Sequence, residues 1–341
     1  MTGSQPNNNS FCHSVAPMMD WTDRHCRYFH RLISPNAILY TEMVTTGALI
    51  FGDKPSHLDF HEKEQPVILQ LGGSDPKDLA KSAKIGADWG YHAINLNCGC
   101  PSDRVQRGRF GACLMTEPEL VATCMQSMQD AVPCDVTVKC RIGVDDCDEE
   151  SCLFTFIETL ASKSATTTFI VHARKAWLKG LNPKENRTVP PLNYDLIKKA
   201  KETFPELNIQ LNGEMNALDK VMNAKNAGLD GAMIGREAYQ NPLFLHQIEN
   251  MLYGENPLNL EPIIQDMHDY IQYMMRMPYP VRPKQITRHM MGLFKGQRGG
   301  KIWRQSLATF PDEPDILLRA YDSYLKASEN DMSYELERAK T

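Results

Sequence analysis

The sequence predicts a (β/α)8 TIM barrel followed by a small C-terminal domain made only of helices. Eight short β-rich runs alternate with longer helical patterns between residues 14 and 245, and eight such units in roughly 230 residues are typical of a TIM barrel. Beyond residue 253 the strand patterns stop and the helical ones continue. A doubly wound sheet would show fewer units, and no G-x-G-x-x-G motif follows the first strand.

The predicted barrel strands are short runs whose neighbours have turn or helix patterns. They cover residues 14–17, 38–42, 67–71, 92–97, 135–140, 168–172, 208–212 and 231–235. Helices are predicted between them at 76–84, 117–130, 195–203 and 218–226, and in the C-terminal part at 261–275, 283–295, 301–307, 316–327 and 334–340. We therefore expect a disordered polar lead at 1–13, the barrel at 14–253 and the helical domain at 257–341.

Composition narrows the class of protein. The chain has 341 residues, 37 Lys and Arg against 42 Asp and Glu, and 42% hydrophobic residues, which suits a globular enzyme. No apolar stretch approaches the roughly 20 residues of a spanning helix, and the first 14 residues show no targeting pattern. We expect a cytoplasmic monomer. The ten cysteines form no C-x-x-C pair, so reduced thiols and no metal site are expected.

Nearly every predicted strand ends in polar or flexible residues, and barrel chemistry collects at the carboxyl ends of the strands. One rim of the barrel is therefore expected to hold a large polar ligand. Glycines follow the last two predicted strands, in Asn212-Gly213 and Gly235-Arg236. Each motif by itself is explained equally well by a phosphate site and by an ordinary turn. Their position on strands seven and eight favours the phosphate, to which Arg236 would add a charge-assisted contact.

Two further residues at this rim have chemical meaning. Lys139 ends a buried strand and needs an anionic partner, for which the edge of a reduced flavin and an ion pair with Glu42 are alternatives. Cys100 lies in a Gly-Cys-Pro turn just past the fourth strand, with no Cys–His activation pair nearby. A thiol with an ordinary pKa is mostly protonated at neutral pH, which suits a general acid.

Six motifs give the chain a resemblance to a known family. They are APMMDWTDR (16–24), YTEMVTTG (40–47), NCGCPSDRVQ (97–106), FGACLM (110–115), VHARKAW (171–177) and PKENR (183–187). They resemble the tRNA-dihydrouridine synthases, and within these the A type, which acts on D-loop uridines 20 and 20a. The resemblance covers residues 15–307.

The resemblance implies an FMN-dependent barrel, NADPH as the electron donor and a helical tRNA-binding domain. Reduced FMN would pass a hydride to C6 of a flipped-out uracil, and Cys100 would give a proton to C5. Asn97 would bind the uracil edge, and His172 or Arg174 its carbonyl side. The FMN contacts implied are Pro17, Met18, Met19, Gln70, Lys139, His172, Asn212, Gly213, Glu214, Gly235 and Arg236.

Two positions depart from the family pattern. Glu214 stands where many relatives have a second glycine, and a carboxylate beside a phosphate is unfavourable unless it points away. Cys98 adds a second thiol two residues before Cys100. The Gly-Cys-Pro context favours Cys100 as the proton donor.

Basic residues are concentrated in one segment of this acidic chain. Residues 270–311 contain eight Lys and Arg and no Asp or Glu, which favours a phosphate-binding stripe over a solvated charged face. By resemblance, the tRNA contacts would be Lys184, Arg187, Lys301 and Arg304. Two alternatives stay open: a flavin reductase or dehydrogenase of a free pyrimidine, of the dihydroorotate or dihydropyrimidine type, and an RNA-binding protein whose barrel is catalytically silent.

Overall fold

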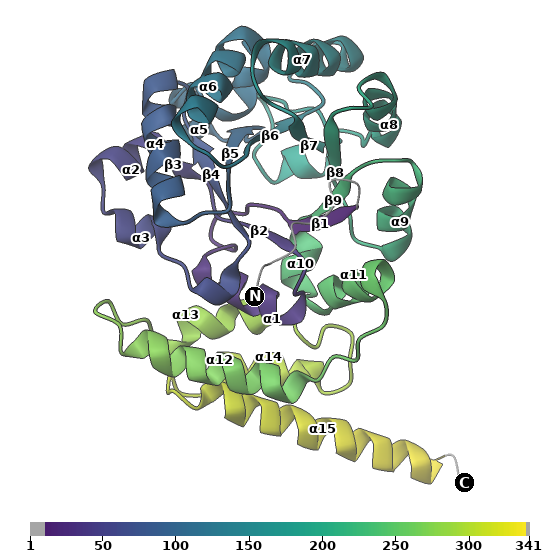
Figure 1. The fold of residues 1–341 in the computed structure, drawn as a ribbon. Coiled ribbons are helices and arrows are strands. Elements are labelled where there is room, and N and C mark those ends of the chain that lie inside the picture. The colour runs from purple at the N-terminus through teal and green to yellow at the C-terminus, as the bar shows by residue number, and fades with distance from the viewer. Residues whose placement is uncertain (1–10, 339–341) are drawn as a thin grey trace. The chain divides into compact units, whose positions relative to one another are not determined.

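The computed structural model describes residues 11–338 and confirms the predicted (β/α)8 barrel, with helices following it. Eight parallel strands form a closed ring, in which β2 pairs with both β1 and β4 (Figure 1). The strands are β1 (Cys12–Val15), β2 (Ile38–Tyr40), β4 (Val67–Gly72), β5 (Ala93–Cys98), β6 (Val136–Arg141), β7 (Thr168–His172), β8 (Asn208–Asn212) and β9 (Gly231–Ile234). A two-residue strand, β3 (Val44–Thr45), pairs with the end of β4.

The observed strands agree with the predicted runs to within one or two residues at each end. The first strand begins at Cys12 because Cys12 and His13 pair with Gly231 and Ala232 of β9. The part of the expected disordered lead at 1–10 lies outside the described residues. Strands β4, β5 and β9 are buried along their whole length, as is expected of parallel strands covered by helices.

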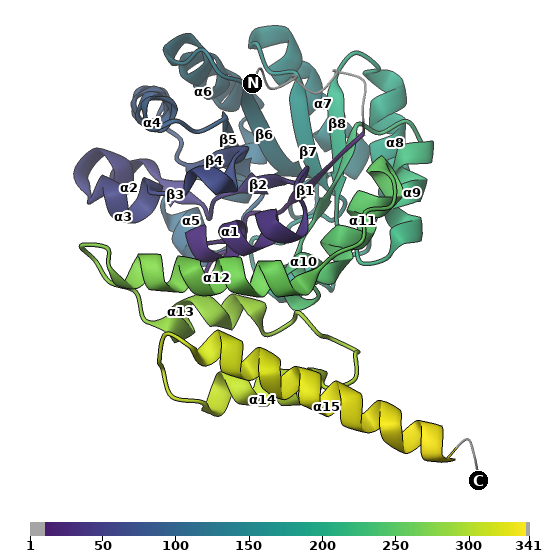
Figure 2. The same cartoon turned by 60° about the horizontal axis from the view of Figure 1, so that its bottom comes forward.

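Helices cover the outside of the barrel, as Figure 2 shows from a second direction. They are α2 (Thr46–Phe51), α3 (Lys54–Leu58), α4 (Pro76–Trp89), α5 (Asp103–Arg107), α6 (Pro118–Ala131), α7 (Glu149–Lys163), α8 (Tyr194–Thr203) and α9 (Leu218–Asn226), with 3-10 turns at Glu62–Glu64, Gly111–Thr116 and Glu185–Arg187. Local sequence explains their ends. In α4, Asp75 caps the first turn and Pro76 occupies its start, while Gly90 ends the helix at φ +99°.

The chain divides into two compact units. One contains residues up to 24 and residues 37–235, and so holds the barrel strands. The other contains residues 25–36 and residues from 236 onward. The second compact unit therefore includes α1 (Arg24–Ile33), α10 (Arg236–Gln240) and α11 (Leu243–Tyr253) as well as the later helices. The functional division expected at 253–257 stays a prediction.

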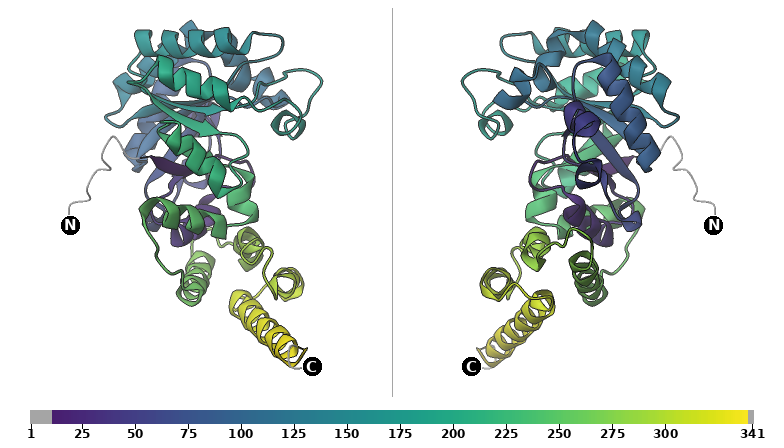
Figure 3. Two further views of the ribbon diagram at one scale, coloured as in Figure 1. Left: turned by 90° about the vertical axis from the view of Figure 1, so that its right-hand side faces the viewer. Right: turned by 90° about the vertical axis from the view of Figure 1, so that its left-hand side faces the viewer.

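The second unit contains only helices among the described residues, which two side views show (Figure 3). Its later helices are α12 (Leu260–Met275), α13 (Pro283–Thr287), α14 (Gly300–Thr309) and α15 (Ile316–Arg338), with a 3-10 turn at Arg288–Met290. The helix predicted at 283–295 is shorter than expected, since turns begin after residue 290 and Gly296 has a φ of +75°. The two helices predicted beyond residue 316 form one continuous α15.

Candidate active site

The pairing register of the strands brings the predicted site residues of the barrel side by side. Asn97 of β5 lies opposite Lys139 of β6, and Asn212 of β8 lies opposite His172 of β7. All of these residues lie in the last three positions of their strands. The expectation that polar side chains gather at one rim is therefore supported by the observed register.

A chain of side-chain amides fixes the turn that carries Cys100. Asn97 donates from Nδ2 to Gln70 Oε1 at 2.8 Å, and Gln70 donates to Asn95 Oδ1 at 2.8 Å. The Asn97 Oδ1 atom accepts hydrogen bonds from the backbone N–H groups of Gly99 and Cys100, at 3.1 and 3.0 Å. Most hydrogen-bonding groups of Asn97 and Gln70 are therefore used within the protein, and one N–H of Asn97 has no acceptor among these bonds.

The structure separates the two neighbouring thiols. Cys98 is 0% exposed, and burial together with the nearby thiols Cys140, Cys124 and Cys113 raises its pKa well above the usual range. Cys100 is half-buried, and its Sγ lies 3.7 Å from Ser102 Oγ. Gly111 packs against this turn at φ +76°, where a Cβ would lie 2.5 Å from the Cys100 carbonyl oxygen. Of the two thiols, only Cys100 is placed to meet a ligand.

Lys139 has no anionic partner among the described residues. Its Nζ donates to Asn212 Oδ1 at 3.1 Å, and Asn212 in turn donates to the Met233 carbonyl at 2.8 Å. The alternative ion pair with Glu42 is therefore wrong, because Glu42 instead accepts from the backbone N–H of Asp20. Burial, followed by the charge of Arg141, lowers the pKa of Lys139 to about 8. An anionic ligand would relieve this unfavourable burial of charge.

His172 is held as a neutral imidazole. Burial, and then the cations Arg141, Lys139, Arg174 and Arg187, hold its pKa well below the usual range. Its ring makes no hydrogen bond to any residue in the described part of the chain. A neutral imidazole without a partner can both donate and accept a hydrogen bond to a ligand.

The loops after β8 and β9 present free backbone donors. The N–H groups of Gly213, Glu214 and Gly235 donate no hydrogen bond within the described chain. A Cβ at Gly235 would meet nothing within 4 Å. Gly213 has a φ of +128°, and there a Cβ would lie 3.1 Å from the His172 ring. Free backbone donors of this kind suit a phosphate group, and Gly235 has open space beside it. Arg236 follows Gly235 as the first residue of α10.

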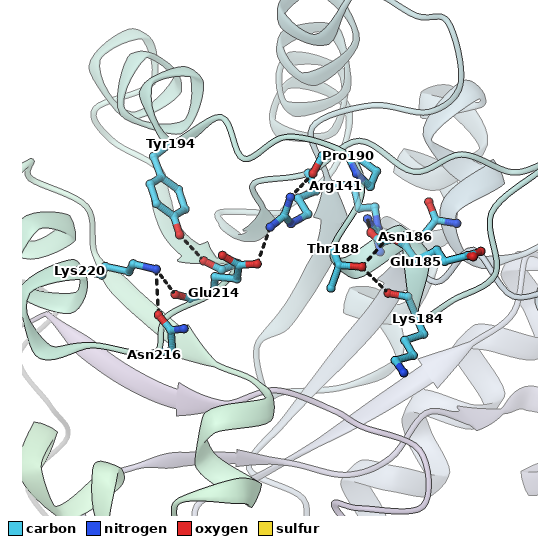
Figure 4. A network of polar contacts seen from close by, with 12 residues as sticks. Arg141, Lys184, Glu185, Asn186, Thr188, Pro190, Tyr194, Glu214, Asn216 and Lys220 are labelled. Carbon is cyan, nitrogen blue, oxygen red and sulfur yellow. Dashed lines mark hydrogen bonds and ion pairs between the residues drawn. The ribbon is translucent and has the colours of Figure 1, made fainter.

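Side chains of neighbouring elements hold the loop at Glu214, and Figure 4 shows Tyr194 and Lys220 beside it. Tyr194 donates to the Gly213 carbonyl at 2.6 Å, and Lys220 donates to the Glu214 carbonyl at 3.1 Å and to Asn216 at 2.8 Å. The Glu214 carboxylate accepts from Arg174 Nη2 at 2.6 Å. Burial and Glu214 raise the pKa of Tyr194 to about 12, so its phenol keeps the donated proton.

This ion pair affects the ligand contacts that were expected of Glu214 and Arg174. The Glu214 carboxylate is taken up by Arg174, while the free backbone N–H of Glu214 is the group suited to an anion. Arg174 also donates from Nη1 to the Pro190 carbonyl, which leaves its buried Nε without a described partner.

Three of the remaining predicted cofactor contacts follow β1. Pro17 and Met18 are half-buried, and Met18 packs against a core cluster that includes Tyr40 and Ile170. Met19 is 59% exposed. Met18 therefore provides a partly buried apolar surface, which suits contact with a flat aromatic ligand, whereas Met19 lies at the surface.

The four basic residues expected to contact RNA are exposed on two different parts of the chain. Lys184 precedes the 3-10 turn Glu185–Arg187 in the barrel unit, and Arg187 ends it. Lys301 and Arg304 lie three residues apart on α14. No ion pair within the described residues involves Lys184, Lys301 or Arg304. Lys295 differs, because Glu237 neutralises it at 3.2 Å.

Sequence analysis assigned no role to Arg141 or Gln106, which both join loops at the rim. Arg141 is 3% exposed and donates to the Gly99, Lys175 and Asn186 carbonyls. Gln106 donates to the Pro101 and Leu178 carbonyls at 2.8 and 2.9 Å. Strand alternation offered a signal for Arg141, because it lies two residues after Lys139 and so on the same face of β6.

The described residues contain neither a metal-binding cluster nor a membrane-spanning helix. Within residues 11–338, no cluster of three or more His, Cys, Asp or Glu could hold a metal ion. No helix of that part of the chain is long and apolar enough to cross a membrane.

Fold and site together define a TIM-barrel protein whose rim combines a thiol, a half-buried lysine and free backbone donors. Comparison with known proteins identifies it more closely: residues 14–327 match the family model for dihydrouridine synthase, and the chain belongs to that family. Relatives called tRNA-dihydrouridine(20/20a) synthase include proteins of Shewanella oneidensis (51% identity, 86% of this chain and 87% of the relative), Vibrio cholerae (49%, 92% and 95%) and Escherichia coli K12 (50%, 86% and 85%).

Proposed function

We propose that this chain reduces uridine to 5,6-dihydrouridine in the D-loop of tRNA, at positions 20 and 20a. FMN would be its flavin and NADPH its electron donor. The observation that carries the proposal is the half-buried Cys100, held by Asn97 at the strand end beside Lys139. A thiol, a half-buried lysine without an anionic partner in the described chain, and a loop with free backbone donors support a flavin-dependent reduction at this rim.

The residues at the rim fit FMN. Lys139 lacks an anionic partner within the described chain, and it is suited to the N1–C2=O edge of the flavin ring. The free N–H groups of Gly213, Glu214 and Gly235, followed by Arg236, are suited to the phosphate. Pro17, Met18, Met19, Gln70, His172 and Asn212 complete the proposed contacts, with Asn212 acting by orienting Lys139. When bound and reduced by NADPH, this flavin supplies a hydride.

Cys100 then completes the addition across the C5=C6 bond of uracil. Hydride arrives at C6, and the thiol gives its proton to C5, which leaves a thiolate that solvent protonates again. Asn97 has one N–H left for the uracil edge. Neutral His172 can donate to a carbonyl oxygen on which negative charge develops. Arg174, whose Nη2 binds Glu214, is the second residue proposed for this contact.

The polynucleotide would be held by phosphate contacts from Lys184, Arg187, Lys301 and Arg304. In this proposal residues 14–253 perform the chemistry and residues 257–341 bind tRNA, in a cytoplasmic monomer. Extruding a uridine from a loop costs only a few kcal/mol, and contacts to phosphates can offset that cost.

A single anaerobic experiment tests the function. The purified flavoprotein is reduced with NADPH, freed of excess reductant and mixed with unmodified tRNA transcript, uracil or orotate. We expect rapid recovery of the oxidised-flavin absorbance with tRNA alone, together with dihydrouridine at positions 20 and 20a. Recovery with a free pyrimidine alone would move the protein to pyrimidine metabolism. A colourless protein that binds tRNA would overturn the enzymatic proposal.

A further inference from the structure

Arg141 connects three stretches of backbone around the proposed proton donor. Its Nε donates to the Gly99 carbonyl at 2.8 Å, one residue before Cys100. Its Nη1 donates to the Lys175 carbonyl at 3.0 Å and to the Asn186 carbonyl at 2.9 Å. Lys175 and Asn186 belong to the loop after β7 that also carries Lys184 and Arg187. One planar guanidinium thus sets the position of the thiol loop relative to the basic loop.

The charge of Arg141 has no carboxylate partner within the described chain. Carbonyl oxygens satisfy Nε and Nη1, while Nη2 donates to no described residue. A buried cation without a counter-ion is costly for folding. Arg141 would therefore be stabilised by a negative charge that forms at the rim. The Cys100 thiol, one residue after the Gly99 carbonyl that Arg141 binds, is a group that becomes negative in the proposed reaction.

The charged groups around the thiol are consistent with this view. Burial lowers the pKa of Arg141 to about 10, and interaction with Cys100 opposes that shift. Lys139 is the second cation that interacts with Cys100. The other titratable groups acting on Arg141 are the cations Arg187 and Arg174.

Gln106 provides a neutral comparison. It joins the same two loops as Arg141, through the Pro101 and Leu178 carbonyls, but it brings no charge. The effect of connecting the loops can therefore be separated from the effect of charge within this one site.

We propose that Arg141 is a positioning residue for the reaction: it fixes the Cys100 loop against the basic loop and stabilises the thiolate left when Cys100 gives up its proton. The inference rests on the proposed function for the identity of the reaction. The charge effect on the thiol can be measured without any turnover.

The first test measures carboxamidomethylation of Cys100 by iodoacetamide as a function of pH, in wild type, Arg141→Lys, Arg141→Met and Gln106→Met. Peptide mass spectrometry distinguishes Cys100 from Cys98, which is buried and reports any loss of structure. We expect the pH of half-maximal reaction to rise in Arg141→Met, to rise less in Arg141→Lys and to stay unchanged in Gln106→Met. An unchanged profile in Arg141→Met, with Cys98 still protected, would overturn the charge effect.

The second test separates kcat from KM for tRNA. A misplaced reacting group costs about 10²-fold in rate, so Arg141→Met should lower kcat by about that factor while flavin reduction by NADPH keeps its rate. Arg141→Lys should recover part of the loss. Equal kcat in all variants would overturn the positioning role. Absence of activity in wild type as well would refute the proposed function and leave the alkylation result standing.

Discussion

The Arg174 guanidinium lies 2.6 Å from a carboxylate oxygen of Glu214, and this ion pair joins the loops after β7 and β8. The arginine side chain is 6% exposed and the glutamate 31% exposed. The carboxylate that looked unfavourable beside a phosphate is neutralised, and the backbone N–H of Glu214 stays free. A residue that departs from the family pattern thereby leaves its backbone donor available for the proposed phosphate contact.

Loss of this ion pair should destabilise the fold. Glu214→Ala leaves the buried Arg174 charge without its partner, and we expect a loss of about 1–3 kcal/mol in the free energy of unfolding, reduced by the partial exposure of Glu214. Urea denaturation measures it. Lys198→Met is the matched control, because it breaks the exposed Lys198–Asp195 pair and should cost less than about 1 kcal/mol. Equal effects of the two variants would contradict the prediction.

The hydrogen bond from Tyr194 to the Gly213 carbonyl should affect binding of the FMN phosphate more than binding of the flavin ring. Tyr194→Phe removes a hydrogen bond of 2.6 Å that holds the loop, so its free N–H groups lose their fixed direction. We expect FMN affinity to fall roughly 3- to 10-fold. Riboflavin, which has no phosphate, serves as the control ligand and should bind both proteins equally. A parallel loss for riboflavin would point to a general disturbance of the site.

Lys139 should make the stability of the flavin-free protein depend on pH. Its pKa is lowered to about 8 from 10.5, so the unfolded chain binds more protons than the native one between these values. Stability therefore rises with pH through that window, and below pH 8 the half-buried charge of Lys139 costs about 3 kcal/mol. Lys139→Met should remove this rise and stabilise the flavin-free protein at pH 7. Thermal melts of both proteins from pH 6 to 10 provide the test, and parallel curves would refute it.

The two thiols near the rim should behave differently when removed. Cys100→Ala should retain FMN and its reduction by NADPH but lower dihydrouridine formation by roughly 10²- to 10⁴-fold, since the general acid is lost. Cys98→Ala is the control, because the Cys98 thiol is buried in the core. Dihydrouridine is quantified by mass spectrometry of digested tRNA. Full activity of Cys100→Ala would exclude this thiol as the proton donor.

Removing unpaired basic residues should weaken RNA binding in a salt-dependent way. Lys301→Gln and Arg304→Gln each remove one expected phosphate contact, so the slope of log affinity against log salt should become shallower by about 1 per contact. Lys295→Gln is the matched control from the same segment, since Glu237 already neutralises Lys295. Fluorescence anisotropy of labelled tRNA at several salt concentrations gives the slopes, and an equal change in the control would count against the contacts.

The sequence by itself predicted the barrel and most of its rim. Buried parallel strands appear as short apolar runs, and the polar residues that end them, such as Lys139 and His172, follow directly from strand position. The helix predicted at 283–295 was wrong beyond residue 290, because helical periodicity does not show where several glycines allow the chain to turn.

Only the tertiary structure decided which atoms at the rim are free. The sequence placed Cys98 and Cys100 two residues apart, but burial separates them into a core thiol and a half-buried one. It left an ion pair between Lys139 and Glu42 open as the alternative to a flavin, whereas Lys139 donates to Asn212. It gave no sign that Glu214 would meet Arg174, forty residues earlier. Strand patterns depend on neighbours along the chain, while the partners of charged side chains depend on which loops the closed barrel brings together.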